Sequence, residues 1–148
     1  MNQAEVERRL QAALRLLSER DGYLLDVGAH ERAITHRLGM YLQGQFHQWD
    51  VDCEYNRDGH EPKRVGLDEG SFAGESSVYP DIIIHRRGRE GPNLLVIEAK
   101  TYHNRAKESV QRDRQKLEAY KRDLHYDHAV FLEVWTGTPR PDPAMQWV

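Results

Sequence analysis

The stretch of residues 79–100 carries the side chains best suited to chemistry in this sequence. Two apolar runs, 82–84 and 94–97, flank a segment rich in glycine and arginine, which is typical of a β-hairpin with buried strands. Asp81 opens the first strand and Glu98 closes the second. Because the strands of a hairpin are antiparallel, the start of one lies beside the end of the other. The hairpin therefore predicts that the two carboxylates are neighbours.

Two neighbouring carboxylates next to a core need compensation. A desolvated carboxylate must be paired, metal-bound or neutralised, and two adjacent ones repel, which raises their pKa or recruits a cation. Lys100 faces the same side of its strand as Glu98 while Ala99 faces the other, because strand side chains alternate. A divalent metal ion beside an ammonium group suits this set. The alternative is that Asp81 is a turn residue and that Glu98 and Lys100 are solvated charges at a strand end.

The apolar pattern along the rest of the chain predicts the elements that position this hairpin. These are helices over residues 2–19 and 29–42, a half-exposed strand over 49–55, a third helix ending near His125, and an apolar strand over 129–135. A strand, helix, strand unit of this length pairs its strands in parallel with a right-handed crossover. The predicted fold class is α/β, with a central mixed β-sheet of about four strands flanked by helices in the order αα-βββ-α-β.

Two further segments are irregular in pattern. Residues 56–77 contain several glycines and acids, and we interpret them either as a mobile flap or as a two-stranded ribbon. Residues 136–148 contain Pro139, Pro141 and Pro143 and are expected to run extended over the surface. The chain is thus expected to be a single domain, with an N-terminal packing helix within residues 1–28, a core over 29–135 and a proline-rich tail.

The composition narrows the class of protein. At 148 residues the chain fits one domain with a core of its own. No apolar run approaches the roughly 18 residues that a membrane span requires, and the charges within residues 1–20 argue against a secretory signal peptide. The single cysteine, Cys53, excludes an internal disulfide and a cysteine zinc cage. These features predict a cytoplasmic protein with no membrane partner.

Proteins that bind nucleic acid are usually basic, so the net charge of −3 argues against such a partner. The net charge is an average over the whole chain, however, and does not describe the charge at a local site. Two bound divalent cations would change it to +1, since −3 + 4 = +1. Residues 101–125 hold seven basic residues against four acids and follow the hairpin directly. A local basic surface beside the proposed metal site is therefore expected.

The motif Pro80-Asp81 followed by Glu98-Ala99-Lys100, each half at the edge of an apolar strand, resembles that of the PD-(D/E)XK nuclease superfamily. The two halves are 17 residues apart (98 − 81 = 17), a separation that one hairpin spans. The resemblance covers roughly residues 29–135. It implies the restriction-endonuclease-like fold and a metal-dependent phosphodiesterase, expected here to be a DNA endonuclease.

The resemblance also implies roles for individual residues. Asp81 and Glu98, with the backbone carbonyl of Ala99, would hold one or two Mg²⁺ ions, for which Mn²⁺ can substitute. Lys100 would orient the attacking water and offset charge in the transition state. In the family a helix before the sheet often supplies another acidic ligand, and Glu31 is the matching residue. The alternative for Glu31 is that it complements the dipole of its helix.

Residues of the third helix are the expected contacts to nucleic acid. Some exonuclease branches of the family carry Gln-x-x-x-Tyr there, whereas this sequence has Lys116-Leu-Glu-Ala-Tyr120, so it departs from that pattern. Lys116 and Tyr120 are one turn apart and share a face. We expect Lys116, Arg112 and Tyr120 to bind nucleic acid, with a solvated helix face as the alternative.

Three functions fit these observations. The first is the nuclease, and cleavage of both strands would require two copies, which predicts a homodimer or a place in a larger complex. The second is a non-catalytic nucleic-acid-binding or regulatory subunit that retains the nuclease fold. The third is a structural α/β domain in which the charges form a surface ion network.

Overall fold

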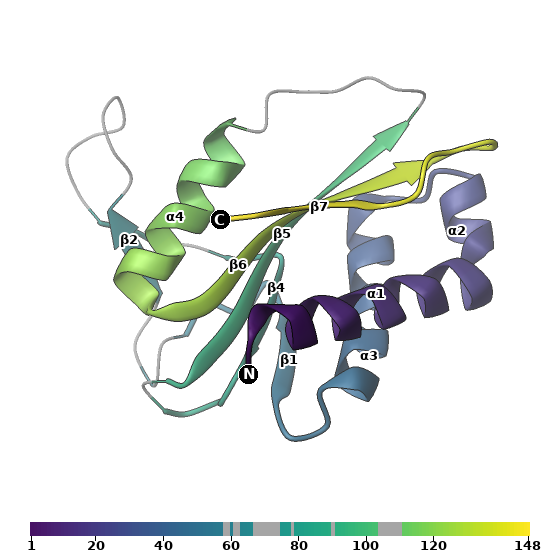
Figure 1. The fold of residues 1–148 in the computed structure, drawn as a ribbon. Helices are drawn as coiled ribbons and strands as arrows, with labels where there is room; N and C mark the ends of the chain where they lie inside the picture. The colour runs from purple at the N-terminus through teal and green to yellow at the C-terminus, as the bar shows by residue number, and fades with distance from the viewer. Residues whose placement is uncertain (58–59, 61–62, 67–74, 78, 90, 104–110) are drawn as a thin grey trace.

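Five strands form the main sheet of the computed structural model, in the order β1-β4-β5-β6-β7 (Figure 1). They are β1 (Asp50–Cys53), β4 (Ile82–His85), β5 (Asn93–His103), β6 (Tyr126–Thr136) and β7 (Ala144–Trp147). β5 and β6 are parallel and the other neighbours are antiparallel. The structure describes residues 1–57, 60, 63–66, 75–77, 79–89, 91–103 and 111–148. The expected mixed α/β class is confirmed.

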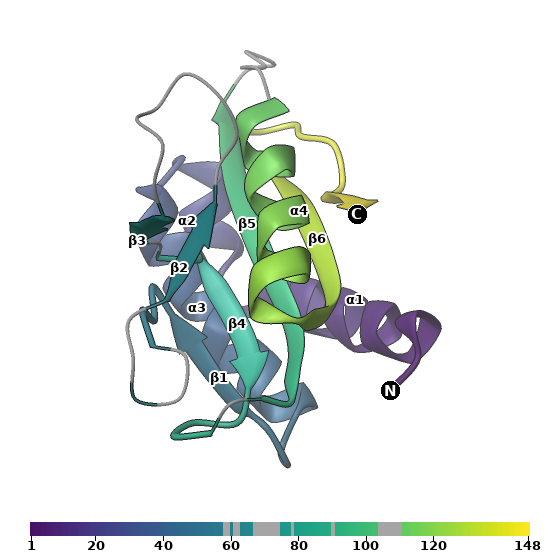
Figure 2. The same cartoon turned by 90° about the vertical axis from the view of Figure 1, so that its left-hand side faces the viewer.

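Helices cover both faces of this sheet, as the second view shows (Figure 2). One face carries α1 (Gln3–Arg20), α2 (Gly22–Asp26) and α3 (Glu31–Gln45), and the other carries α4 (Gln111–Leu124). Two hydrophobic clusters match this division. The larger joins α1 and α3 to alternate residues of the strands, including Ile82, Ile97 and Ala99. The smaller joins α4 to the intervening residues, including Ile83 and Val96.

The central hairpin forms in the register that its apolar runs predict. β4 and β5 pair antiparallel, with Ile82 opposite Ile97. The prediction that Glu98 closes the second strand was wrong, because β5 continues to His103. Beyond Ile97 the strand still pairs with β6, so its other edge is left beside the residues that precede β4.

The C-terminal tail differs from the expectation. Residues 144–147 form β7, an antiparallel edge strand on β6 with Val130 opposite Trp147. The prolines at 139, 141 and 143 all precede this strand, so they leave its backbone N–H groups in place. The sheet therefore has five strands rather than about four.

The segment 56–77 contains a small separate ribbon, one of the two alternatives for it. β2 (Arg64–Gly66) and β3 (Glu75–Ser77) pair antiparallel, while residues 67–74 lie outside the described part of the chain. The ribbon is tied to the end of α4, since the Gly66 N–H donates to Asp123 Oδ2 at 2.9 Å and Arg122 donates to the Gly66 carbonyl at 2.6 Å. Within the described residues, no helix combines the length and apolar character that a bilayer crossing requires.

Candidate active site

The hairpin places Asp81 beside Glu98. Ile82 pairs with Ile97, so one step outward along the same register brings Asp81 level with Glu98. The carboxylate of Asp81 turns toward β5, where Oδ2 accepts a hydrogen bond from the backbone N–H of Ala99 at 2.8 Å. Asp81 thus accepts the hydrogen bond of a β5 N–H group at the position just before β4 begins.

Glu31 approaches the same edge of β5 from the first residue of α3. Its Oε2 accepts hydrogen bonds from the Thr101 backbone N–H at 3.1 Å and from the Thr101 hydroxyl at 3.4 Å. N–H groups two residues apart lie on the same edge of a strand, so Ala99 and Thr101 present theirs to Asp81 and Glu31 in turn. The two carboxylates are therefore neighbours along this edge.

Glu98 faces the opposite layer and is held by α4. Its side chain is buried, with the residue 5% exposed. Tyr120 donates its hydroxyl proton to Oε1 at 3.1 Å, and the ammonium of Lys116 lies 3.7 Å from Oε2. Lys116 and Tyr120 share a helix face, as their spacing predicts, and that face is the one turned toward Glu98.

Asp113 is a further acid at this site that the sequence analysis did not identify. It is 8% exposed, and its Oδ1 lies 3.4 Å from the Lys116 ammonium. A signal for it was present, because Asp113 precedes Leu117 by four residues and Tyr120 by seven, which places it on the buried stripe of α4. An acid on an inward stripe is unusual enough to mark a site.

The environment of this cluster disfavours the ionised form of Asp81 and Glu98. Burial raises the pKa of Asp81, and the charges of Glu31 and Asp113 add to that increase, against the Ala99 hydrogen bond and Lys116. Burial, followed by the charge of Asp81, raises the pKa of Glu98 to about 8, against Lys116 and Tyr120. Among the described residues, the acids of this cluster outnumber the ammonium group that contacts them, that of Lys116, so the cluster favours binding of a cation.

Lys100 has a different environment from Lys116. It is partly exposed and lies on the same strand face as Glu98, two residues on. Across the described ranges, no carboxylate or hydrogen-bond acceptor contacts its ammonium. Its cross-strand neighbour is Glu133, which is 3% exposed and accepts a hydrogen bond from Gln146 at 3.3 Å. Glu133 was not among the expected site residues, although it is a lone acid within the apolar run 129–135.

The three residues expected to bind nucleic acid lie in different places. Tyr120 is 1% exposed, and burial together with Glu98 raises the pKa of its hydroxyl. It lies beneath Glu98, so the prediction that it contacts nucleic acid is corrected to a role in holding that carboxylate. Lys116 is turned toward the acids, and Arg112 is exposed on α4. Two other basic residues of the expected surface, Arg105 and Lys107, lie outside the described residues.

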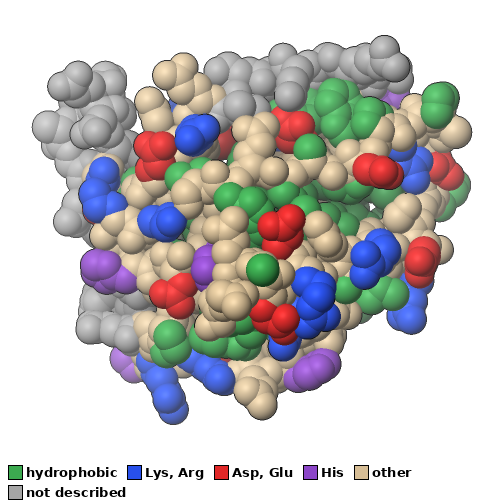
Figure 3. Space-filling model, in the orientation of Figure 1, with side chains coloured by type: hydrophobic (Ala, Val, Ile, Leu, Met, Phe, Trp, Pro, Cys, Tyr) green, Lys and Arg blue, Asp and Glu red, His purple; other side chains and the backbone are tan. Residues whose placement is uncertain are grey.

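The described residues form no basic surface on one face of the molecule. On the face that carries α1 and β7, acidic and basic side chains are interspersed and neither sign forms a continuous field (Figure 3). A nucleic-acid backbone is bound mainly through concentrated positive charge. This face is therefore a poor candidate for such a partner.

The donor set suits a hard cation in part. Among the described residues, no group of three or more acids, histidines or cysteines is already arranged to hold a metal ion. Asp81 and Glu98 provide one carboxylate each, and in both of them, as in Glu31, one oxygen accepts a hydrogen bond from the protein. Mg²⁺ commonly binds through one or two carboxylates and keeps several waters. In donor type and number, the pair is therefore compatible with Mg²⁺, and with Mn²⁺ by the same donor chemistry.

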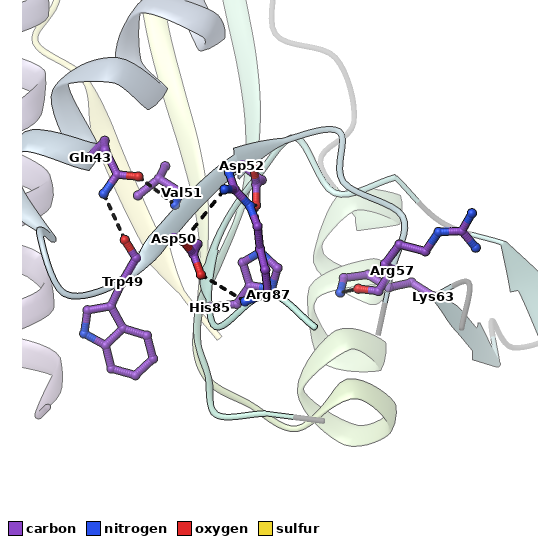
Figure 4. A network of polar contacts seen from close by, with 9 residues as sticks. All are labelled: Gln43, Trp49, Asp50, Val51, Asp52, Arg57, Lys63, His85 and Arg87. Atoms are coloured by element: carbon purple, nitrogen blue, oxygen red, sulfur yellow. Dashed lines mark hydrogen bonds and ion pairs between the residues drawn. The ribbon is translucent and has the colours of Figure 1, made fainter. Parts of the chain in front are cut away.

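A second polar cluster lies at the other end of β4 (Figure 4). His85 is 3% exposed, and its Nε2 lies 2.8 Å from Asp52 Oδ2. Arg87 donates to both oxygens of Asp52, from Nε at 2.8 Å and from its terminal nitrogen. Asp50 accepts the Arg87 backbone N–H at 3.0 Å. Here the Arg87 guanidinium lies within ion-pair distance of both carboxylates, so the cluster has no evident need of a further cation.

The resemblance to PD-(D/E)XK nucleases thus depends on residues 80–81 and 98–100 and on the strands that carry them. The structure brings Asp81, Glu98 and the strand face of Lys100 to one end of the hairpin. Comparison with known proteins identifies no relative of this chain. No protein-family model matches the chain, and no curated protein and no solved structure matches it either.

Proposed function

We propose that this protein is a metal-dependent nuclease that hydrolyses phosphodiester bonds in DNA. The observation that carries the proposal is the placement of Asp81 and buried Glu98 side by side at the start of β4. Burial raises the pKa of both carboxyls, the charge of Asp81 adds to the increase at Glu98, and the charges of Glu31 and Asp113 add to the increase at Asp81. Strongly perturbed carboxylates of this kind cluster at functional sites. A structural ion network would instead pair its charges, as the cluster around Asp52 does.

Asp81 and Glu98, with the Ala99 carbonyl, are the groups that would hold Mg²⁺. When bound, the ion supplies a Lewis acid for the phosphoryl oxygen and lowers the pKa of a coordinated water. Glu31 adds negative charge beside Asp81, as its effect on the pKa of Asp81 shows. Tyr120 holds Oε1 of Glu98, which fixes the orientation of that carboxylate.

Lys100 is proposed to act on the reacting groups themselves. Its ammonium lies on the Glu98 side of β5 and has no carboxylate partner among the residues described. A cation in that position can orient an attacking water and stabilise the charge that develops on the phosphate. Glu133 beside it on β6 would limit where the side chain can lie.

The test is a plasmid-nicking assay with Mg²⁺ or Mn²⁺. Asp81→Asn and Lys100→Ala should each lower the nicking rate by about 100-fold or more, because they remove a metal donor and the cation beside the phosphate. Glu118→Gln is the matched control, since Glu118 is an exposed carboxylate on α4 that pairs only with Arg114 at 3.5 Å among the described residues. Nicking that survives both site substitutions would reject the proposed site.

A second candidate function is a nucleic-acid-binding or regulatory subunit without catalysis. The observation that favours it is that Lys116, a protein group, already lies beside Glu98 in the place where a metal would be expected to act. Metal-dependent DNA binding without cleavage, measured by fluorescence anisotropy on a labelled duplex, would support this function. Loss of that binding in Asp81→Asn would assign it to the same site.

A further inference from the structure

We infer that Lys116 is the built-in counter-ion of the metal-free site and that its ammonium competes with a divalent cation for the carboxylates. This inference depends on the proposed function, because it assumes that the acids bind a metal. It goes beyond that function by assigning Lys116 to control of metal affinity. In this role Lys116 stabilises the metal-free protein and weakens metal binding.

The ammonium of Lys116 bridges two acids of the site. It lies 3.4 Å from Asp113 Oδ1 and 3.7 Å from Glu98 Oε2. Both separations exceed the roughly 2.7–2.9 Å of a tight charge-assisted hydrogen bond. The charge is therefore shared between two carboxylates and held tightly by neither, which is the arrangement expected of a group that can be displaced.

The exposure of the three side chains supports displacement. The Lys116 side chain is 30% exposed, against 6% for Glu98 and 11% for Asp113. The ammonium thus approaches the acids from the solvent side. Lysine carries its charge on a flexible chain of methylene groups, so it can swing into water without opening the cluster formed by Leu117 and Tyr120.

The charge of Lys116 reaches both proposed metal donors. It acts on Glu98 directly and opposes the increase in the pKa of Asp81 as well. A group that stabilises the metal-free form and must leave on loading lowers the apparent affinity by the same free energy. Removal of this charge should therefore shift metal affinity and metal-free stability in opposite directions.

The experiment measures Mn²⁺ binding by titration calorimetry and melting temperature in EDTA and in Mn²⁺. Lys116→Met keeps the length of the side chain and removes its charge. We expect it to melt at a lower temperature than wild type in EDTA, because the acids lose their counter-ion, and to bind Mn²⁺ roughly tenfold more tightly, about 1.4 kcal/mol. Lys116→Arg keeps a positive charge and should remain within about twofold of wild type.

Lys121→Met is the matched control on the same helix. The Lys121 ammonium donates to the Val148 carbonyl at 2.8 Å and takes no part in the acid cluster. This variant should leave the Mn²⁺ affinity unchanged. If Lys116→Met does not fold, Lys116→Gln repeats the test, because glutamine removes the charge and keeps a hydrogen-bond donor for Glu98.

The outcomes separate the inference from the proposed function. Mn²⁺ binding that is lost in Asp81→Asn but unchanged or weaker in the neutral Lys116 variants would overturn the counter-ion role and leave the metal site standing. Absence of Mn²⁺ binding to wild type at millimolar concentration would overturn both. Tighter binding in the neutral variants with lower metal-free stability would establish the role.

Discussion

Partly buried acids lie near the two ends of β4 in opposite electrostatic conditions. At the His85 end, burial raises the pKa of Asp52, but hydrogen bonds from Arg87 and His85 outweigh it and leave that pKa below its ordinary value. At the Asp81 end, burial also raises the pKa, and the neighbouring acids keep it raised despite the Ala99 hydrogen bond. The strand between them is four residues long. Two aspartates near opposite ends of one short strand, Asp52 on the neighbouring β1 and Asp81 just before β4, thus have pKa values shifted in opposite directions.

The difference lies in the cations available to each carboxylate. Arg87 contacts both oxygens of Asp52, and the interaction raises the pKa of the guanidinium above its ordinary value. Lys116 is shared between Glu98 and Asp113 at longer distances. A self-neutralised cluster stabilises the fold, whereas an uncompensated one costs stability and is retained where it binds something. The comparison therefore favours the Asp81 end as the location of the proposed site.

The largest expected effect on stability is at the His85 end of β4, where the acidic and basic side chains neutralise one another. Asp52→Ala would leave buried His85 without its acceptor and Arg87 without its carboxylate. We expect the free energy of unfolding to fall by about 3 kcal/mol, measured by urea denaturation. DNA nicking by the folded fraction should stay near the wild-type rate. A large loss of nicking at unchanged stability would show that the site extends to this end.

The pH dependence of stability should reveal the raised pKa of Glu98 at the Asp81 end of β4. In EDTA, Glu98 has a pKa near its ordinary 4.5 when unfolded and about 8 when folded. Between these values the folded state binds more protons, so the free energy of unfolding falls as pH rises through this window and is highest below it. We expect a loss on the order of 2 kcal/mol from pH 5 to pH 8.

Glu98→Gln is the control for this pH dependence. It should flatten the curve and make the metal-free protein more stable than wild type at pH 8, because no buried charge remains to be formed there. Mn²⁺ should restore the stability of wild type at pH 8 and leave Glu98→Gln nearly unchanged. Equal pH slopes for the two proteins would contradict the burial of an ionising Glu98.

The smallest expected effect concerns the hydroxyl that holds Glu98. Tyr120→Phe keeps the buried ring and removes one hydrogen bond to Oε1. Loss of that bond should raise the pKa of Glu98 further, extend the fall in stability to higher pH, and cost about 1 kcal/mol at pH 8. Thermal melts at a series of pH values measure this shift. A melt profile identical to that of wild type would mean that the hydroxyl does not act on Glu98.

Local patterning accounts for most of the fold. The amphipathic stripe of α1 and the strand, hairpin, helix, strand order were predicted from periodicity, and the parallel pairing of β5 with β6 from the helix that connects them. The strand that was not predicted, β7, is short and follows three prolines. Its formation depends on pairing with β6 more than on its own sequence.

The sequence by itself determined the neighbourhood of Asp81 and Glu98, because hairpin register follows from alternation over about twenty adjacent residues. Only the tertiary structure decided which groups complete that neighbourhood. Periodicity showed that Lys116 and Tyr120 share a face, but the docking of α4 on the sheet turned that face inward, buried Tyr120 under Glu98 and brought in Asp113. That docking is set by packing between residues distant in sequence, such as Leu117 and Ile83, and so no local pattern contains it.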